Sequence, residues 1–106
     1  MKYSDHRIEE EISHRAAEFL NRESNRTSLI TVTRTLLSKD GRHADILITV
    51  FPEEKDKEAL DFLKRLRGDL RAHLRKETKL ARLPFLDFKI DLGEKNRQRL
   101  DEISNK

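Results

Sequence analysis

The feature that most constrains the fold is a helical stretch at residues 58–82 that carries two stripes of different chemistry. Its leucines recur at steps of three and four residues, which places them on one side of a helix; they are Leu63, Leu66, Leu70 and Leu74. Cations recur with the same spacing, at Lys64, Arg67, Arg71, Arg75 and Lys79. At about 100° per residue the basic stripe lies roughly 115° from the leucine stripe. One stripe can therefore pack on a core while the other faces solvent or a polyanion.

Two strand-like segments precede this stretch and a third follows it. Residues 29–37 alternate apolar side chains such as Ile30 and Val32 with threonines, which is typical of a strand with one buried face. Residues 43–51 carry apolar side chains on both faces, which predicts a central strand. Turn residues with Gly41 join the two segments into a hairpin, because glycine adopts a positive φ without strain. Apolar residues alternate again over residues 85–92, which predicts a third strand.

Helices are also predicted at both ends of the chain. The first should be capped by Ser4 or Asp5 and end near residues 22–24, and a weaker one should cover residues 94–103 with Leu100 and Ile103 on its apolar side. The predicted order is therefore α-β-β-α-α-β-α. A helical crossover of over 30 residues joins the second and third strands, which permits parallel pairing. We expect an α+β fold in a single domain, residues 1–106, with a three-stranded mixed sheet in the order one, two, three and helices packed on one face.

Composition excludes several classes of protein. The chain has no cysteine, so disulfides, thiolate metal sites and cysteine nucleophiles are excluded. An apolar fraction of 35% allows a modest core but not a large active-site cavity. The N-terminus has no apolar signal region, and no apolar run approaches the roughly 18 residues of a membrane span. We expect a soluble cytoplasmic protein that makes no membrane contact.

Charge is distributed unevenly along the chain. Residues 64–82 contain eight Lys or Arg and two Asp or Glu, a net of +6, although the whole chain has a net charge of only +3. Such a local concentration predicts a directed contact with a polyanion. The alternative is a solvated helix face whose cations form salt bridges.

The sequence offers no catalytic or metal-binding arrangement. The four histidines, His6, His14, His43 and His73, lack a ligand spacing such as H-E-x-x-H, and the three glycines do not form a phosphate-binding or dinucleotide-binding fingerprint. No nucleophile elbow is present. We interpret His73, between Arg71 and Arg75, as a surface residue. The chain is therefore predicted to be a non-enzyme without cofactor or metal.

Several short motifs, in a shared order, resemble those of one family. The hairpin turn carries Ser38 and Asp40, with Ala44 at the second strand, and that strand runs into the acidic linker Phe51-Pro52-Glu53-Glu54. The helical stretch ends in Lys79-Leu80-Ala81-Arg82-Leu83-Pro84 before the third strand, Asp91 ends that strand, and Arg99-Leu100 follows in the last helix. Together these motifs resemble the bacterial ribosome-binding factor A family, small non-enzymatic factors of small-subunit maturation.

The resemblance implies a type II KH-like fold, which is an RNA-binding fold. Most KH domains carry a Gly-x-x-Gly loop that clamps the nucleic-acid backbone, and this chain has none. The family replaces that loop with an Ala-x-Gly kink, which here is Leu66-Arg67-Gly68 and keeps only the glycine. The resemblance further implies binding to the immature 30S ribosomal subunit and its 16S rRNA, assistance in late processing near the 5′ end, and a role in cold adaptation. We expect the protein to act as a monomer.

The predicted RNA contacts are the cations of the central helices, together with one glycine. They are Arg65, Arg67, Gly68, Arg71, Arg75, Lys76, Lys79 and Arg82. Guanidinium groups match phosphate oxygens in a bidentate way. Gly68 either forms a kink that lets the backbone approach RNA, which the family likeness favours, or lets two helices pack closely. Arg42 and His43 at the hairpin end are secondary candidates, which we interpret first as exposed turn residues.

Aromatic residues are few, which weakens the case for base recognition. Single-stranded RNA is usually bound by stacking bases on aromatic side chains. The spacing of the phenylalanines predicts that all of them lie in the core; they are Phe19, Phe51, Phe62, Phe85 and Phe88. We therefore expect recognition of folded RNA through shape and phosphate contacts. The alternative function is a protein–protein adaptor on the same scaffold.

Overall fold

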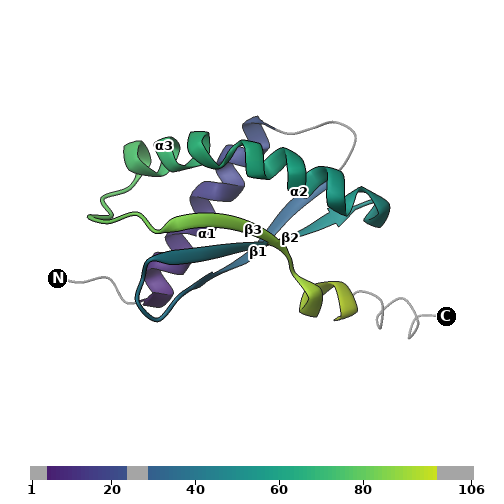
Figure 1. Ribbon diagram of the computed structural model, residues 1–106, viewed down its shortest axis with the longest axis horizontal. Helices are drawn as coiled ribbons and strands as arrows, with labels where there is room; N and C mark the ends of the chain where they lie inside the picture. Colours follow the sequence, from purple (N-terminus) through teal and green to yellow (C-terminus); the bar gives the residue numbers. More distant parts are fainter. Residues whose placement is uncertain (1–4, 24–28, 98–106) are drawn as a thin grey trace.

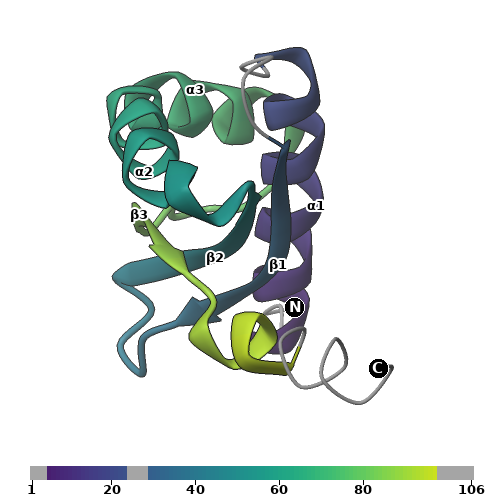
Figure 2. The ribbon, with the colours of Figure 1, turned by 90° about the vertical axis from the view of Figure 1, so that its right-hand side faces the viewer.

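The structure, a computed structural model, describes residues 5–23 and 29–97 as a three-stranded sheet with helices on one face (Figure 1, Figure 2). Its elements are α1 (Asp5–Arg22), β1 (Leu29–Leu37), β2 (His43–Phe51), the 3-10 helix η1 (Glu53–Lys55), α2 (Asp56–Arg65), α3 (Arg67–Glu77) and β3 (Phe85–Ile90). Residues 92–97 are again helical. Leu100 and Ile103 of the predicted last helix lie outside the described residues. No helix in the described ranges is long and apolar enough to cross a membrane.

The sheet has the predicted order and strand directions. The central strand β2 pairs antiparallel with β1, where Leu29 faces Phe51, and parallel with β3, where His43 faces Phe85. The register shifts between Val32 and Arg34, which marks a β-bulge in β1. Parallel pairing of β2 and β3 is possible because η1, α2 and α3 provide the long crossover between them.

The core lies between the sheet and the three long helices. Alternate residues of β2 and β3 point into it, because side chains on a strand alternate between the two faces. The strands contribute Ala44, Ile46, Ile48, Leu86 and Phe88, and the helices contribute Ile12, Ala16, Phe19, Leu20, Leu63, Leu70 and Leu74. The leucine stripe of the central helices therefore packs on the core as predicted, with Leu66 half-buried at its middle.

The third strand is shorter than its alternating pattern predicts. It ends at Ile90, and Leu92 is 65% exposed at the start of a helical segment. The cause is Asp91, whose Oδ1 accepts a hydrogen bond from the backbone N–H of Glu94 at 3.0 Å, as a helix-capping carboxylate does. Its Oδ2 accepts the hydroxyl of Thr33 at 2.5 Å. Capping by Asp91 thus overrides the apolar alternation that predicted a strand as far as residue 92.

The sheet face opposite the helices is uncovered in the described structure, and it carries two of the phenylalanines that were predicted to be core. Phe51 is 74% exposed and Phe85 is 55% exposed, whereas Phe19 and Phe88 are buried and Phe62 is half-buried against the core. Strand parity explains the difference, since Phe51 and Phe85 point away from the side that Ile48 and Phe88 bury. The prediction was wrong for Phe51 and Phe85 because the long helices of residues 5–23 and 29–97 all pack on the other face (Figure 2).

The outer edge of β1 is held by side chains of α1. The backbone N–H of Leu37 donates to Oε2 of Glu9 at 2.7 Å, and the hydroxyls of Ser13 and Thr35 lie 2.7 Å apart. These contacts fix α1 against β1 and use backbone and side-chain polar groups that an edge strand otherwise exposes.

The hairpin turn between β1 and β2 is built by its own polar side chains. Ser38 donates through its hydroxyl to Oδ1 of Asp40, which also accepts the backbone N–H of Arg42. The hydrogen bond from Ser38, followed by the one from Arg42, holds the pKa of the Asp40 carboxyl below its ordinary value. Gly41 has φ +72°, so the positive φ predicted for it is confirmed.

Candidate nucleic-acid interface

The helical crossover is broken at a single residue, so that α2 and α3 run end to end above the sheet (Figure 1). Leu66 has φ −91° and ψ 0°, and its backbone N–H donates to the carbonyl of Leu63 in a tightened last turn. The backbone N–H of Leu70 donates to the carbonyl of Leu66, so the next helix starts at once. The break therefore bends the path of the crossover without separating its two halves.

Gly68 lies just past this break, in the first turn of α3. It has no positive φ, and a Cβ built on it meets no heavy atom within 4 Å. Close helix packing at Gly68, one of the two interpretations of this glycine, is therefore wrong. The other interpretation, approach of the backbone to RNA, stays a prediction.

Exposed cations lie along the outer surface of the helix pair and on the loop that follows it. They are Lys64 and Arg65 at the end of α2, Arg75 and Lys76 at the end of α3, and Lys79 and Arg82 in the loop. Within residues 5–23 and 29–97 none of these side chains has a hydrogen-bond or ion-pair partner. We call these six residues the basic ridge. Their charges are available to an external polyanion.

Two further predicted contacts, Arg67 and Arg71, are partly engaged inside the molecule. Nη1 of Arg71 donates to the carbonyls of Pro84 at 2.9 Å and Leu83 at 3.5 Å, which ties α3 to the start of β3. Nη1 of Arg67 lies 3.5 Å from Oδ1 of Asp87, and its guanidinium carbon lies 5.3 Å from the ring centroid of Phe85. Both arginines are half-buried, so they present less charge to solvent than the basic ridge does.

Helix geometry shows how these cations are placed around α3. Residues four apart in sequence differ by about 40° around the helix axis. Arg67, Arg71 and Arg75 therefore follow one flank of α3, the flank beside β3. Lys76 is about 100° further round from Arg75. Arg75 thus lies toward the flank of Arg67 and Arg71, whereas Lys76 lies on another side of α3.

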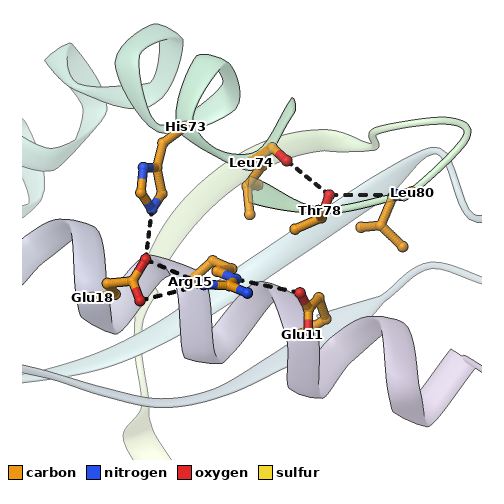
Figure 3. Close-up of polar contacts among 7 residues, drawn as sticks. All are labelled: Glu11, Arg15, Glu18, His73, Leu74, Thr78 and Leu80. Carbon is orange, nitrogen blue, oxygen red and sulfur yellow. Dashed lines mark hydrogen bonds and ion pairs between the residues drawn. The ribbon is translucent and has the colours of Figure 1, made fainter. Parts of the chain in front are cut away.

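The opposite flank of α3 is closed by α1, through a set of polar contacts around His73 (Figure 3). Nε2 of His73 lies 3.1 Å from Oε1 of Glu18, and Nη2 of Arg22 lies 2.9 Å from Nδ1. Because arginine only donates, Nδ1 accepts and Nε2 carries the proton. The ring of His73 also lies 5.6 Å from that of Phe19, and its side chain is 8% exposed. The interpretation of His73 as a surface residue was wrong, because this flank of α3 packs against α1.

Glu18 connects this contact to a second cation on α1. Arg15 lies 3.3 Å from carboxylate oxygens of both Glu11 and Glu18 (Figure 3). Burial raises the pKa of Glu18, but its hydrogen bond with His73 and its ion pair with Arg15 outweigh that effect and leave the pKa below its ordinary value. Glu18 is therefore an anion that joins α1 to α3.

The loop that carries Lys79 and Arg82 is anchored at its start by Thr78. The hydroxyl of Thr78 donates to the carbonyl of Leu74 at 2.7 Å and accepts the backbone N–H of Leu80 at 3.4 Å (Figure 3). This ends α3 and fixes the direction in which the chain leaves it. The loop then borders a hollow of about 390 Å³, whose lining includes Lys79 and Arg82 together with Asp5 and Asp40.

No metal centre competes with this surface as a candidate site. Among the residues that the structure describes, no three His, Asp or Glu side chains gather in a way that could hold a metal ion. Arg42 and His43, the secondary candidates, are both exposed beside Phe85. Sequence reasoning identified the cations but missed Phe85, although its parity with Asp87 in the strand pattern indicated an outward side chain.

Comparisons with known proteins point in one direction. Residues 4–104 match the family model described as Ribosome-binding factor A. A curated relative of that name from Prochlorococcus marinus (strain NATL1A) is 37% identical over 87 residues, which cover 81% of this chain and 71% of the relative. The chain spans 62% and 65% of the length of two other relatives of that name, from Fervidobacterium nodosum and Thermosipho africanus.

Two solved structures share the fold over most of the chain. The crystal structure of ribosome-binding factor A from Thermus thermophilus superposes with a TM-score of 0.73 at 30% identity, covering 83% of this chain and 97% of that one. Coordinates of the Thermus thermophilus protein fitted into a cryo-EM map of a 30S complex superpose with a TM-score of 0.67 at 30% identity, covering 76% and 88%.

Proposed function

Because this chain belongs to the ribosome-binding factor A family, we propose that it binds the immature 30S ribosomal subunit through contacts with 16S rRNA. It acts there as a cytoplasmic assembly factor without catalysis, and it assists rRNA processing and small-subunit maturation. A role in cold adaptation belongs to the same proposal. The similarity to a protein fitted into a 30S complex supports the choice of partner.

The observation that carries this proposal is the unpartnered basic ridge. Lys and Arg side chains on a protein surface neutralise phosphates and release the counterions bound to RNA. The six cations of the ridge lie at the end of α2, at the end of α3 and in the following loop, a path that passes the partly engaged Arg67 and Arg71. A path of this kind suits the backbone of folded RNA, which is recognised mostly by shape and phosphate contacts.

Helix stability alone does not explain these charges. Cations in the last turn of a helix interact favourably with its negative end, which accounts for Lys64 and Arg65 in α2 and for Arg75 and Lys76 in α3. Lys79 and Arg82 lie outside any helix, on the loop after α3. Neither has a carboxylate partner within residues 5–23 and 29–97, which favours an external anion as the reason for these two charges.

The test compares two single charge reversals, one on the basic ridge in α3 and one away from it in α2. Arg75→Glu removes a ridge cation, and Lys57→Glu removes an exposed cation near the start of α2, away from the ridge. Co-sedimentation with purified immature small subunits is measured over a series of salt concentrations. We expect Arg75→Glu to weaken binding. It should also reduce the steepness of log K against log salt concentration by the amount that corresponds to about one phosphate contact. Lys57→Glu should leave both the affinity and the salt dependence unchanged.

A triple variant gives the larger effect. Reversal of Arg65, Arg75 and Lys79 together should abolish co-sedimentation, while circular dichroism shows an unchanged fold because none of the three side chains has an internal partner in the described structure. Undiminished binding of this variant would overturn the proposed surface. Binding to a protein partner that survives high salt and RNase would instead identify the adaptor function.

A further inference from the structure

We propose that the exposed ring of Phe85 is a stacking site for one unpaired RNA base, on the sheet face opposite the helices and next to Arg67 and Arg42. The inference rests on the proposed RNA-binding function and extends it from folded RNA to a single-stranded nucleotide. Phe85 is the first residue of β3, and it points away from the core that Leu86 and Phe88 enter.

The surroundings of the ring are those of a nucleotide site. The ring of His43 meets Phe85 edge-on, at 5.9 Å between centroids and 65° between planes, which limits rotation of the phenyl group. The guanidinium of Arg67 lies over the ring at 5.3 Å. Phe85 as a whole residue nevertheless stays 55% exposed, which leaves room for a ligand. Stacking on aromatic side chains tolerates any base, because every base has a π face.

Cations next to the ring can reach the phosphates of a stacked nucleotide. Arg42 is exposed, and its carbonyl accepts the backbone N–H of Phe85 at 2.7 Å, which fixes the two residues side by side. The ion pair of Arg67 with Asp87 is long at 3.5 Å and has a side-chain exposure of 37% on the arginine. Because this pair is long and only half-buried, it contributes little stability, so Arg67 can exchange the carboxylate for a phosphate.

The same surroundings disfavour a protein partner at this ring. Protein interfaces are built on contiguous apolar patches, but the neighbours of Phe85 on the open face are charged. Besides His43, they are Asp87, which is paired with Arg67, and Asp45, which lies opposite Asp87 in the register and pairs with Lys89 at 3.0 Å. A single aromatic ring with arginines and ion pairs around it is better suited to bind a nucleotide than to bind the apolar surface of another protein.

Phe51 supplies a matched control, because it is an exposed phenylalanine on the same face at the far end of β2. Its cross-strand neighbour is Leu29, which is apolar. Truncation of either phenylalanine removes an exposed ring and leaves the core intact. Within the part of the chain that the structure describes, Phe85 is the one of the two with arginines and a histidine around it.

Binding is measured by fluorescence anisotropy with a short single-stranded RNA of mixed sequence, and with the same RNA annealed to its complement. Phe85→Ala and Phe85→Leu should both weaken single-strand binding about tenfold, because leucine keeps the apolar volume but has no π face. Phe51→Ala should bind as the wild type does. Duplex binding should be the same for all four proteins, since its bases are already stacked.

A tryptophan variant reports the stack directly. The chain has no tryptophan, so Phe85→Trp introduces a single indole, whose emission should be quenched by single-stranded RNA while Phe51→Trp is not. Equal single-strand affinity of Phe85→Ala and the wild type, or equal quenching at both positions, would overturn the inference.

These outcomes separate the inference from the proposed function. If the wild type co-sediments with small subunits and Arg75→Glu weakens that binding while Phe85→Ala has no effect on RNA, only the stacking site fails. If Phe85 passes its tests but the wild type does not bind small subunits, the proposed function fails and the stacking site stands.

Discussion

Replacing Gly68 with alanine should stabilise the fold, although this glycine lies beside the break between α2 and α3. Glycine inside a helix costs about 0.5–1 kcal/mol relative to alanine, mainly through backbone entropy. At Gly68 a Cβ meets no heavy atom within 4 Å, and φ is not positive, so no steric term opposes the gain. Since Gly68 occupies the first turn of α3, we expect the lower end of that range, about 0.5 kcal/mol, or roughly 2–4 °C in Tm for a domain of this size.

The assay is urea and thermal unfolding followed by circular dichroism. Ala72→Gly is the matched control, because Ala72 is exposed within the same helix and the reverse change there should destabilise the fold by about 0.5–1 kcal/mol. A Gly68→Ala variant less stable than the wild type would refute the reasoning, since it would mean that the break needs a conformation that alanine does not adopt.

The same variant distinguishes the structural and functional roles of Gly68. If the RNA backbone approaches the protein at this position, an added methyl group blocks that approach, and Gly68→Ala should bind small subunits more weakly even though it is more stable. A variant that gains stability and keeps full binding would show that the glycine makes no close contact with RNA.

Two other positions have effects of definite sign. Gly41→Ala should lower the free energy of unfolding by about 1–2 kcal/mol, measured in urea, because Gly41 has φ +72° and a side chain is strained there; Gly41→Asn should lose less. Asp91→Asn should cost about 1–3 kcal/mol at pH 7, since Asp91 is 3% exposed and bonded to Thr33. Burial raises the pKa of Asp91, but hydrogen bonds from Thr33 and the Glu94 N–H, with the charge of Arg34, outweigh it and lower the pKa. Because its pKa is lower in the folded protein, the ionised carboxyl of Asp91 stabilises the fold at every pH above the ordinary aspartate pKa, which is near 4. This stabilisation is lost as the pH falls below that value and through the folded-state pKa. The difference between Asp91→Asn and the wild type should therefore shrink in urea titrations below about pH 4; a constant difference down to pH 2 would contradict the assignment.

Much of the fold could be predicted from local patterns. Strand periodicity located the hairpin and β3, and apolar residues on both faces identified β2 as the central strand, which the structure confirms. The end of β3 could not be predicted in this way, because Leu92 continues the alternation while Asp91 starts a helix. A capping residue decides such a boundary through hydrogen bonds that periodicity does not report.

The candidate site was predictable in its charges but not in their pairing. The spacing of the cations indicated a basic surface, and six of them are exposed without partners in the described residues. The spacing could not show that Arg71 donates to the carbonyls of Leu83 and Pro84, because those carbonyls reach α3 only through the tertiary fold. Nor could it show which face of the sheet the described helices cover, and Phe85 is exposed on the other face (Figure 2).

The contact between Glu9 and the edge of β1 has a consequence for self-association. A strand from a second molecule that added itself to β1 would need the amide of Leu37 as a donor, and that amide is already satisfied by a carboxylate. An incoming chain would have to displace Glu9, and it would bring its own carbonyl dipoles up to a negative charge. The carboxylate of Glu9 therefore discourages a strand of a second molecule from pairing with the end of β1 at Leu37.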